Sequence, residues 1–359
     1  MKIGLVRRGY SSSGGAERYL LRFAAALRAA GHEAVLFGGG EWPAGAWEGE
    51  LVRVEGNGPR AFADGLRRAR PREHCDLVFS LERVWECDAY RAGDGVHRAW
   101  LARRAAYEPA WKGWYRQRQG KHREILELEQ AVFAGDGERV IIANSHMVAR
   151  EIAHYFSLPE ARVRVVHNGL PAGSGIAPEG RRAEVRARLG LAAGECAVLF
   201  AGSGWERKGL RFAMEGINRS AGATLLVAGR GRRRGLPASA RTRFLEDTQD
   251  VAALMEAADL FLLPTIYDPF SNASLEAMAA GLPVITTTAN GFAEVMRPGQ
   301  DGEALADAAD IAGIAGAIAK WSASETPETR AARRLEARRH TIDANLTATL
   351  AALGAAAAR

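Results

Sequence analysis

The sequence predicts an α/β chain with two parallel sheets, each covered by helices. The first observation is the length of 359 residues, which is about twice that of an ordinary domain. The second is that short apolar runs alternate with segments of helical periodicity in both halves of the chain. The third is the stretch 170–180, rich in Pro and Gly, after which the alternation of apolar runs and helical segments begins again. We therefore predict two domains, 1–169 and 170–334, and a helical tail whose last part, 335–359, can pack back on the first domain.

The first half contains five apolar runs of strand length. An intervening segment, Glu17–Ala30, places Leu20, Phe23 and Leu27 on one helical face, and Gly31 favours its end. The predicted buried strands are Lys2–Val6, Glu33–Phe37, Asp76–Phe79, Val140–Ala143 and Val163–Val166.

The second half repeats the alternation. A helix is expected from Gly209, and another should begin near Ser271 or Asn272 and end before Gly281, because these residues suit helix caps. The tail from Glu328, rich in Ala and Arg, is predicted to be helical. The predicted strands are Ala197–Ala201, Thr224–Ala228, Leu260–Leu263 and Val284–Thr287.

The composition indicates the cellular compartment of the protein and the class of partner that it binds. The net charge of +6 favours an anionic partner, which could be a nucleotide, a phospholipid surface or a nucleic acid. The three cysteines are far apart, suit neither zinc nor a disulfide framework, and favour a reducing cytoplasm. The first ten residues read as a strand rather than a signal peptide. No apolar run approaches the roughly 20 residues that span a bilayer.

The loop between the first strand and the first helix carries Gly14 and Gly15. Adjacent glycines allow a backbone to approach a ligand closely, and the N–H groups of the helix start favour an anion. The loop either contacts a phosphate or is only a turn. It is not the GxGxxG pattern of a dinucleotide site.

A second loop, 201–209, follows the first strand of the second half. Its small residues Gly202 and Ser203 precede two adjacent cations, Arg207 and Lys208, at the start of a helix. In a cleft between two sheets, both cations could neutralise charge on a departing diphosphate. The alternative interpretation is that Arg207 and Lys208 are ordinary solvated side chains on the protein surface. The loop lacks the Gly-Lys-Ser/Thr order of residues that defines a Walker A loop.

A third loop has two acids, Asp268 and Glu276, on either side of a predicted helix start. Backbone N–H groups at that start could hold a phosphate. Two carboxylates there make sense if they accept hydrogen bonds from sugar hydroxyls, whereas stabilisation of the helix dipole would explain only one of them. The residues expected at the helix start are Ser271, Asn272, Ala273 and Ser274.

At these residues the chain resembles glycosyltransferase family 4. The spacing Asp268…Glu276 matches that family's E-x7-E motif with Asp in the first place, and Arg207-Lys208 matches its cationic pair. Gly14-Gly15 matches its donor loop, and 143–147 with 166–169 matches the end of its first domain. Within the family the chain is most similar to the lipopolysaccharide core glucosyltransferase I group, where 90–94 matches a segment whose Asp, here Asp94, is thought to serve the acceptor.

The resemblance implies the GT-B fold, two Rossmann-like domains that face a deep interdomain cleft. It implies a retaining, metal-independent transfer of a hexose from a nucleotide-diphosphate sugar, similar to UDP-glucose, to a lipid-linked saccharide of the lipopolysaccharide core. No Asp-x-Asp pair stands in a post-strand loop, so the protein's own cations would neutralise the charge. We expect no cofactor beyond the nucleotide sugar, no nucleic-acid partner and a monomer.

The resemblance also assigns roles to residues. Arg207 and Lys208 would stabilise the leaving diphosphate, and Asp94 would orient or deprotonate the acceptor hydroxyl. Glu276 would bind ribose and Asp268 the sugar hydroxyls. Gly15 and the backbone of 272–274 would bind the phosphates. The other residues expected to bind the donor are Gly14, Gly202, Ser203 and Ser271, and the helix-start residues are Asn272, Ala273 and Ser274. Read from the sequence alone, Asp94 is equally a turn residue between two glycines.

A basic and aromatic segment, 97–123, suits the headgroup region of an anionic bilayer. The acceptor of the similar group is anchored on the inner face of the cell membrane, so we expect peripheral binding there. Two other interpretations remain open: a solvated helical face with buried aromatics, and a nucleic-acid surface. The predicted membrane-contact residues are Arg98, Trp100, Arg103, Arg104, Trp111, Lys112, Trp114 and Arg116.

Two other functions are compatible with the sequence. A nucleotide-sugar 2-epimerase uses a similar two-domain fold, and a nucleic-acid-binding protein would account for the charge. A second basic run, 230–234, follows the strand Thr224–Ala228. It either rims a cleft, where it could meet acceptor phosphates or the donor, or is a solvated loop.

Overall fold

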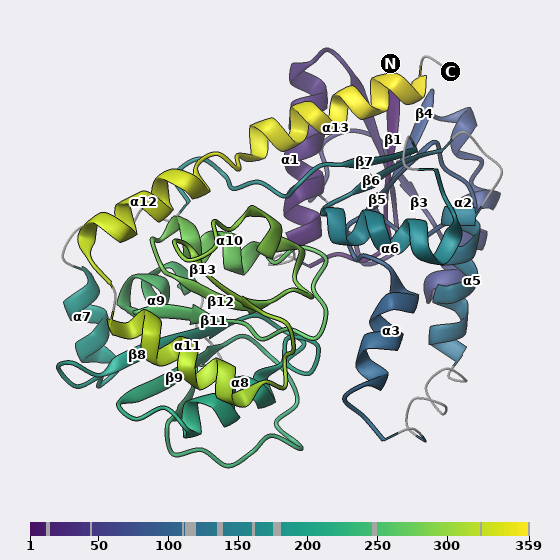
Figure 1. Cartoon of the computed structure of the whole chain (residues 1–359). Helices are drawn as coiled ribbons and strands as arrows, with labels where there is room; N and C mark the ends of the chain where they lie inside the picture. Colours follow the sequence, from purple (N-terminus) through teal and green to yellow (C-terminus); the bar gives the residue numbers. More distant parts are fainter. Residues whose placement is uncertain are drawn as a thin grey trace. The chain divides into compact units, whose positions relative to one another are not determined.

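The computed structural model (Figure 1) describes residues 1–11, 15–43, 45–109, 111, 120–134, 139–159, 162–174, 181–245, 250–323 and 325–357. The chain forms two compact units. Unit 1 comprises Met1–His167 and Asp343–Arg359, and unit 2 comprises Asn168–Ile342. The second unit is therefore inserted in the chain of the first.

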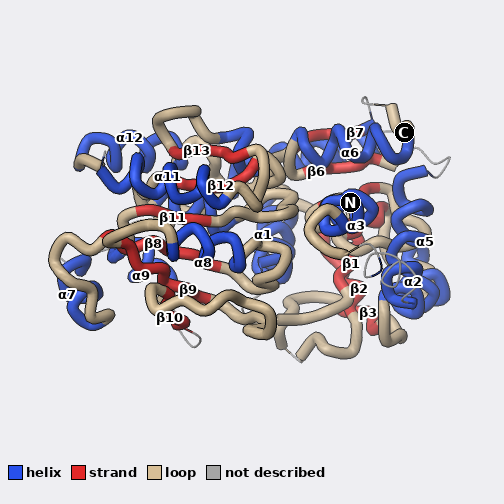
Figure 2. The backbone as a smooth tube through the Cα atoms, turned by 60° about the horizontal axis from the view of Figure 1, so that its bottom comes forward, coloured by secondary structure: helices blue, strands red, loops and turns tan. Residues whose placement is uncertain are grey.

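Unit 1 contains a seven-stranded, all-parallel sheet in the order β3-β2-β1-β4-β5-β6-β7. Helices flank the strands, as Figure 2 shows. The strands are β1 (Lys2–Arg7), β2 (Glu33–Gly38), β3 (Leu51–Arg53), β4 (Leu77–Ser80), β5 (Ala89–Ala92), β6 (Val140–Ala143) and β7 (Val163–Val165). The helices are α1 (Gly15–Ala29), α2 (Pro59–Arg68), η1 (Pro71–Glu73), α3 (His97–Ala105), α5 (Gly120–Ala134), α6 (His146–Phe156) and α13 (Ile342–Ala357).

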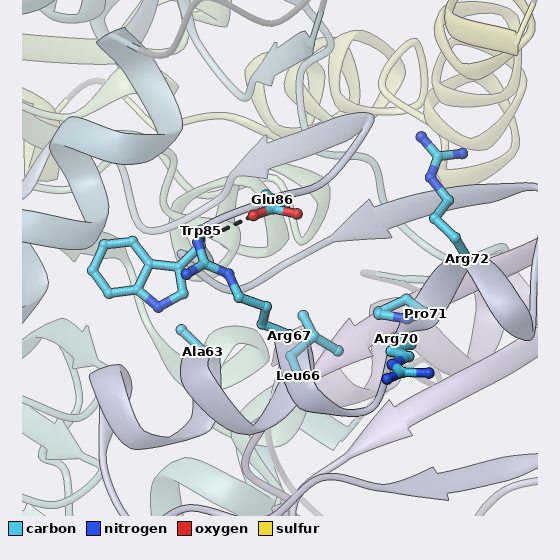
Figure 3. Close-up of a pocket in the computed structure, with 8 residues that line it drawn as sticks. All are labelled: Ala63, Leu66, Arg67, Arg70, Pro71, Arg72, Trp85 and Glu86. Carbon is cyan, nitrogen blue, oxygen red and sulfur yellow. Dashed lines mark ion pairs between the residues drawn. The ribbon is translucent and has the colours of Figure 1, made fainter.

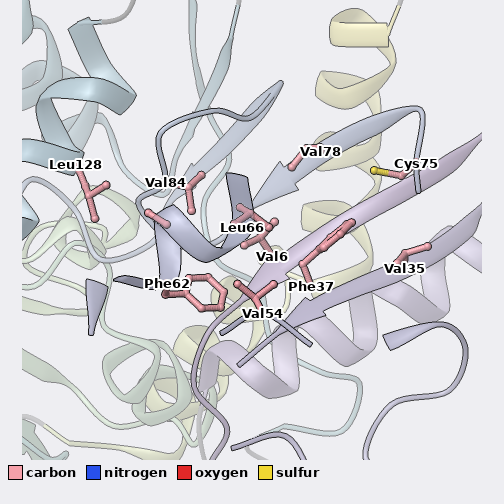
Figure 4. Close-up of a cluster of buried hydrophobic side chains, with 11 residues drawn as sticks. Val6, Val35, Phe37, Val54, Phe62, Leu66, Cys75, Val78, Val84 and Leu128 are labelled. Atoms are coloured by element: carbon pink, nitrogen blue, oxygen red, sulfur yellow. The ribbon is translucent and has the colours of Figure 1, made fainter. Parts of the chain in front are cut away.

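One cluster of the core of unit 1 lies around β1, an interior strand of the sheet. Val6 belongs to a cluster of buried apolar side chains that includes Phe37 from β2 and Phe62 from α2 (Figure 4). Close packing here requires a glycine at position 4, because a Cβ atom there would lie 2.6 Å from the Sγ atom of Cys75. The strand is thus apolar on both faces, as expected for a buried parallel strand.

The C-terminal helix α13 belongs to unit 1. The hydroxyl groups of Tyr19 on α1 and Thr349 on α13 lie 3.3 Å apart, and Arg91 on β5 donates a hydrogen bond to Tyr19 Oη at 3.2 Å. The guanidinium of Arg91 also lies 4.1 Å from the centre of the Tyr19 ring. The last helix therefore packs on the first one.

Unit 2 contains a six-stranded, all-parallel sheet in the order β10-β9-β8-β11-β12-β13. Its strands are β8 (Cys196–Ala201), β9 (Ala223–Ala228), β10 (Thr242–Leu245), β11 (Leu260–Leu262), β12 (Val284–Thr287) and β13 (Gly302–Leu305). Its helices are α7 (Arg181–Arg188), α8 (Leu210–Asn218), α9 (Val251–Ala257), α10 (Asn272–Ala279), η3 (Gly291–Val295), α11 (Ile311–Ala323) and α12 (Pro327–Ala337).

Every strand that the sequence predicts is present within one or two residues, whereas β3, β5, β10 and β13 were not predicted. The tail is helical as expected, but it forms two helices, α12 and α13, with a break at 338–341. None of the described helices is both long and apolar enough to cross a membrane.

Candidate active site

The loop after β8 is shaped by two glycines. Gly202 has φ of +145°, and a Cβ atom there would lie 2.7 Å from Cδ of Lys208. Gly209 has φ of +74°, and a Cβ atom there would lie 1.9 Å from the carbonyl oxygen of Pro264. Both positions therefore exclude a larger residue, and at Gly202 the space is taken by the aliphatic part of Lys208.

Lys208 and Arg207 meet at one carboxylate, that of Asp268. Lys208 Nζ lies 2.9 Å from Asp268 Oδ2, and Arg207 Nη1 lies 3.8 Å from the same oxygen. Arg207 Nη1 also donates a hydrogen bond to the carbonyl oxygen of Tyr267 at 3.0 Å. The sequence-predicted cations and the first predicted acid are therefore brought together, although 60 residues separate them in the chain.

Asp268 is ionised although it is only 5% exposed. Burial by itself would raise the pKa of its carboxyl, but the charges of Lys208 and Arg207, together with hydrogen bonds from Lys208 and the backbone of Phe270, lower that pKa below the ordinary 3.8. Its backbone is fixed as well, since Asp268 N donates to Ala289 O and Gly291 N donates to Asp268 O, both at 2.9 Å. The site therefore holds two cations and one anion on rigid supports.

Helix α10 begins beside this cluster. Ser271 is its N-cap, and Ser271 Oγ accepts a hydrogen bond from Ser274 N at 3.2 Å. Asn290 Oδ1 accepts hydrogen bonds from Ser271 N at 3.2 Å and from Phe292 N at 3.1 Å. The sequence reasoning missed Asn290, although an Asn-Gly pair shortly after a strand is a recognisable turn signal.

The helix ends as predicted. Gly281 has φ of +86°, its N–H bonds to Met278 O at 2.9 Å, and Leu282 N bonds to Ala277 O at 3.0 Å, which is a Schellman arrangement. On the helix itself, Asn272 is exposed, whereas Ala273 and Glu276 are partly buried. Asn272 Oδ1 accepts a hydrogen bond from Asn168 Nδ2 at 2.8 Å.

The carboxyl end of the sheet in unit 1 carries Asp94. The residue follows β5 in a turn that is closed by a hydrogen bond from Gly95 N to Ala92 O at 3.1 Å, and it is exposed. Gly15 is the first residue of α1 in the same unit, and Gly14 lies outside the described residues.

The end of β1 places a charged cluster at the same edge of this sheet. Arg7 pairs with Glu17 Oε1 at 2.9 Å and with Glu82 Oε1 at 3.0 Å. Burial raises the pKa of Glu82, Arg7 opposes this rise, and the negative charge of Asp94 adds to it. The sequence reasoning missed this cluster, because the acids lie 10 and 75 residues from Arg7.

The start of α3 is held by a carboxylate from another helix, that of Glu129 on α5. Glu129 is fully buried, and it accepts hydrogen bonds from His97 N at 2.5 Å and from Arg98 N at 3.0 Å. Arg83 Nε lies 3.3 Å from Glu129 Oε1. An anion at a helix N-terminus is favourable, and here it fixes the helix that follows the Asp94 turn.

Much of the predicted membrane-contact set lies on α3, where its cations have partners within the protein. Arg103 pairs with Glu151 at 3.0 Å and Arg104 pairs with Glu108 at 3.2 Å. The guanidinium of Arg98 lies 5.2 Å from the centre of the Phe156 ring, and that of Arg104 lies 5.3 Å from the centre of the Trp100 ring. Trp111 is 66% exposed. Lys112, Trp114 and Arg116 lie outside the described residues.

A pocket of about 220 Å³ in unit 1 is distinct from these loops. Arg67 and Trp85 line it, and Arg67 forms an ion pair with Glu86 at 3.1 Å (Figure 3). Its lining residues 70–72 and 85–86 precede β4 and β5, so the pocket lies towards the amino ends of these strands. Ligands of open α/β sheets bind at the carboxyl ends, which disfavours this pocket as the active site.

Among the described residues, no group of three or more His, Cys, Asp or Glu side chains is placed to hold a metal ion. Arg207 and Lys208 contribute cations at the candidate site.

Both halves of the sequence match known families. Residues 13–172 match Glycosyltransferase Family 4, and residues 195–324 match Glycosyl transferases group 1. The chain belongs to glycosyltransferase family 4. The lipopolysaccharide core biosynthesis glycosyltransferase LpsE of Rhizobium meliloti is 27% identical over 339 residues, with 90% of each chain covered. The lipopolysaccharide glucosyltransferase WaaG of Escherichia coli is 26% identical over 331 residues, with 83% of each covered.

Solved structures agree on the fold of this glycosyltransferase. A crystal structure of WaaG, described as a glycosyltransferase involved in lipopolysaccharide biosynthesis, has a TM-score of 0.76 at 22% identity and covers 94% of both chains. Anabaena HepE in complex with UDP has a TM-score of 0.72 at 15% identity, with 99% of this chain and 100% of HepE covered. The predictions of family membership and of the GT-B fold are confirmed.

Proposed function

We propose that this glycosyltransferase moves a hexose from a nucleotide-diphosphate sugar, such as UDP-glucose, to a lipid-linked saccharide of the lipopolysaccharide core type. The observation that carries the proposal is the cluster of Arg207, Lys208 and Asp268 beside the start of α10. It combines cations for a diphosphate with a carboxylate for hydroxyl groups on one rigid loop system.

The proposed reaction retains the anomeric configuration. The bond between the anomeric carbon and the distal phosphate oxygen breaks, and its electron pair stays on the nucleotide diphosphate. The acceptor oxygen forms its bond to the same carbon from the same face, and its proton passes to the departing phosphate. Arg207 and Lys208 stabilise the charge that develops on the leaving group, so no divalent ion is required.

In unit 2, the backbone N–H groups at the start of α10 bind phosphate oxygens, because a helix N-terminus favours anions. Glu276 accepts hydrogen bonds from ribose hydroxyls. Asp268 has two tasks, since its carboxylate orients Lys208 and its remaining acceptor capacity binds hydroxyls of the transferred sugar.

In unit 1, Asp94 orients or deprotonates the acceptor hydroxyl, and the loop at Gly14 and Gly15 contacts the donor phosphates. The exposure of Asp94 supports this role, because an acceptor needs access to its carboxylate. The neighbouring carboxylates of Glu17 and Glu82 are both paired with Arg7, whereas Asp94 is exposed.

The names of similar proteins support the donor and the acceptor. HepE has been solved with UDP, with UDP and glucose, and with UDP-glucose. WaaG of Escherichia coli is a lipopolysaccharide glucosyltransferase. For this chain we propose the same classes of substrate and a monomer that needs no nucleic acid.

A transfer assay with purified lipopolysaccharide core acceptors and UDP-, GDP- and ADP-glucose tests the proposal. Lys208→Ala should lower kcat by about 100-fold or more, because it removes a group that stabilises the leaving diphosphate. Glu276→Ala should lower turnover through weaker ribose binding. Lys320→Ala is the matched control, since Lys320 is an exposed lysine in unit 2 that pairs with Glu303 at 3.0 Å. Turnover close to wild type in either site variant would reject the assignment.

We also propose that the segment 97–123 binds the inner face of the cell membrane. The exposed Trp111 supports this proposal, because Trp is favoured at the headgroup level. Flotation with vesicles of phosphatidylcholine alone or mixed with phosphatidylglycerol should show binding to the anionic vesicles only, and salt should weaken it. Equal partition to both kinds of vesicle would contradict this part of the proposal.

A further inference from the structure

The loop after β9 carries an unusual density of positive charge. We call residues 230–234 the arginine loop; its sequence is Arg-Gly-Arg-Arg-Arg, and all five residues are exposed. The guanidinium of Arg233 lies 4.2 Å from the centre of the Phe244 ring. Among the described residues, no carboxylate pairs with Arg230, Arg232 or Arg234. Three guanidinium groups are therefore available to an anion.

The arginine loop is bonded to the loop that carries Lys208. Gly202 N donates to Ala228 O at 3.0 Å, Gly204 N donates to Arg230 O at 3.1 Å, and Arg230 N donates to Ser203 Oγ at 3.3 Å. The two loops thus form one continuous surface at the carboxyl end of β8 and β9.

Glycine contacts bring the two loops still closer. A Cβ atom on Gly229 would lie 2.5 Å from Gly202 O, and a Cβ atom on Gly202 would lie 2.7 Å from Lys208 Cδ. A chain of direct contacts therefore runs from the residue before Arg230 to the side chain of Lys208.

The net positive charge around Lys208 is smaller than the negative charge on the proposed leaving group. Arg207 and Lys208 contribute two positive charges, but both lie within 4 Å of the buried Asp268, so the cluster has a net charge of one. A nucleotide diphosphate that is bonded to a sugar carries about two negative charges, and a third develops as the bond to the sugar breaks, before the acceptor proton reaches the phosphate. More positive charge must face the leaving group, or its departure remains unfavourable.

We infer that the arginine loop supplies this charge, and that Arg230, Arg232 and Arg234 bind the diphosphate of the donor and of the departing nucleotide. This inference rests on the proposed function. Arg is suited to the task because its planar fork of donors matches phosphate oxygens. The contacts with the Lys208 loop favour the donor diphosphate over an anionic group on the acceptor, because they place the arginine loop beside the donor cations within the same unit.

The test compares two triple variants with the same change in net charge. The first is Arg230→Gln/Arg232→Gln/Arg234→Gln. The matched control is Arg188→Gln/Arg219→Gln/Arg338→Gln, which removes three exposed arginines from other parts of unit 2. Titration calorimetry with inorganic pyrophosphate, UDP and uridine gives the affinities, and circular dichroism checks the fold of each variant.

The arginine-loop variant should bind pyrophosphate and UDP about tenfold more weakly or worse, with a smaller salt dependence, while the control stays within about twofold of wild type. Uridine binding should not change, because the nucleoside carries no phosphate. Unchanged pyrophosphate and UDP affinity, or an equal loss in both triple variants, would overturn the inference.

Lys208→Ala separates this inference from the proposed function. If Lys208→Ala weakens pyrophosphate and UDP binding and the arginine-loop variant does not, the inference fails and the proposed function stands. If neither variant changes the binding, both fail. The single variant Arg232→Gln, in which the loop backbone is least disturbed, should show a smaller loss in the same direction, and its absence would also count against the inference.

Discussion

The buried ion pair between Lys208 and Asp268 should stabilise the fold, and this prediction can be tested without an activity assay. Lys208→Met removes the charge and keeps most of the aliphatic chain that lies on Gly202. Among the residues that the structure describes, Arg207 at 3.8 Å would then be the remaining cation partner of the Asp268 carboxylate, which is 5% exposed. Removing one partner of a buried pair destabilises a protein by about 3–5 kcal/mol. Because Arg207 remains, we expect a loss near the lower end, about 3 kcal/mol.

The loss should depend on pH with a definite sign. In the wild type the pKa of Asp268 is below its ordinary 3.8, so the pair stabilises the fold above about pH 4 and loses its effect as the pH falls through the lower, folded value. In the variant, burial remains while the stronger of the two opposing charges is gone, so the folded pKa rises above the unfolded one. The variant therefore gains stability on acidification, and its deficit against wild type should shrink.

Differential scanning calorimetry at about pH 7 and about pH 4.5 measures this difference. For a unit of this size, about 3 kcal/mol corresponds to a fall in Tm of about 6–12 °C near neutral pH. The control is Lys320→Met, whose pair with Glu303 is largely exposed and should contribute less than about 1 kcal/mol. Equal losses in both variants, or a deficit that grows on acidification, would refute the reasoning.

Three further substitutions test the supports of the candidate site. Ser271→Ala removes the helix cap, whose hydroxyl accepts a hydrogen bond from Ser274 N, and should lower the free energy of unfolding by about 1 kcal/mol in urea titrations. An unchanged urea midpoint would show that this cap does not stabilise the helix. Glu129→Ala leaves the N-terminus of α3 without its anion, so native-state hydrogen exchange should become faster in the first turn of α3; unchanged exchange there would contradict the structure. Gly202→Ala should displace Lys208 and lower turnover more than stability, and full activity would show that the close approach has no function.

The sequence was sufficient for the strands that carry an apolar run and not for β3, β5, β10 and β13. β1 and β8 have continuous apolar runs because helices cover both faces of the sheet. β3 is only three residues long and partly exposed, and β10 reads Thr-Arg-Phe-Leu with every residue partly buried. Such strands lack an apolar run, and their pairing with neighbours decides their conformation.

The loops of the candidate site could be predicted from the sequence, but the ion pairs between them could not. Arg207, Lys208 and the start of α10 follow strands, where ligands of parallel sheets bind, so their position could be inferred. The shared use of Asp268 by both cations could not, because it joins loops 60 residues apart. Glu82 was missed for the same reason, since a distance of 75 residues in the chain hides its contact with Arg7.

The insertion of unit 2 into unit 1 has a practical consequence. The chain leaves unit 1 after His167 and returns at Asp343, and close to these points Leu170 pairs with 340–342 through hydrogen bonds from Leu170 N to His340 O and from Ile342 N to Leu170 O, both 2.8 Å long. A domain with its own hydrophobic core can in principle fold alone, and the ends of this segment are bonded to each other. The fragment 168–342 would then let nucleotide binding by unit 2 be measured without any contribution from unit 1.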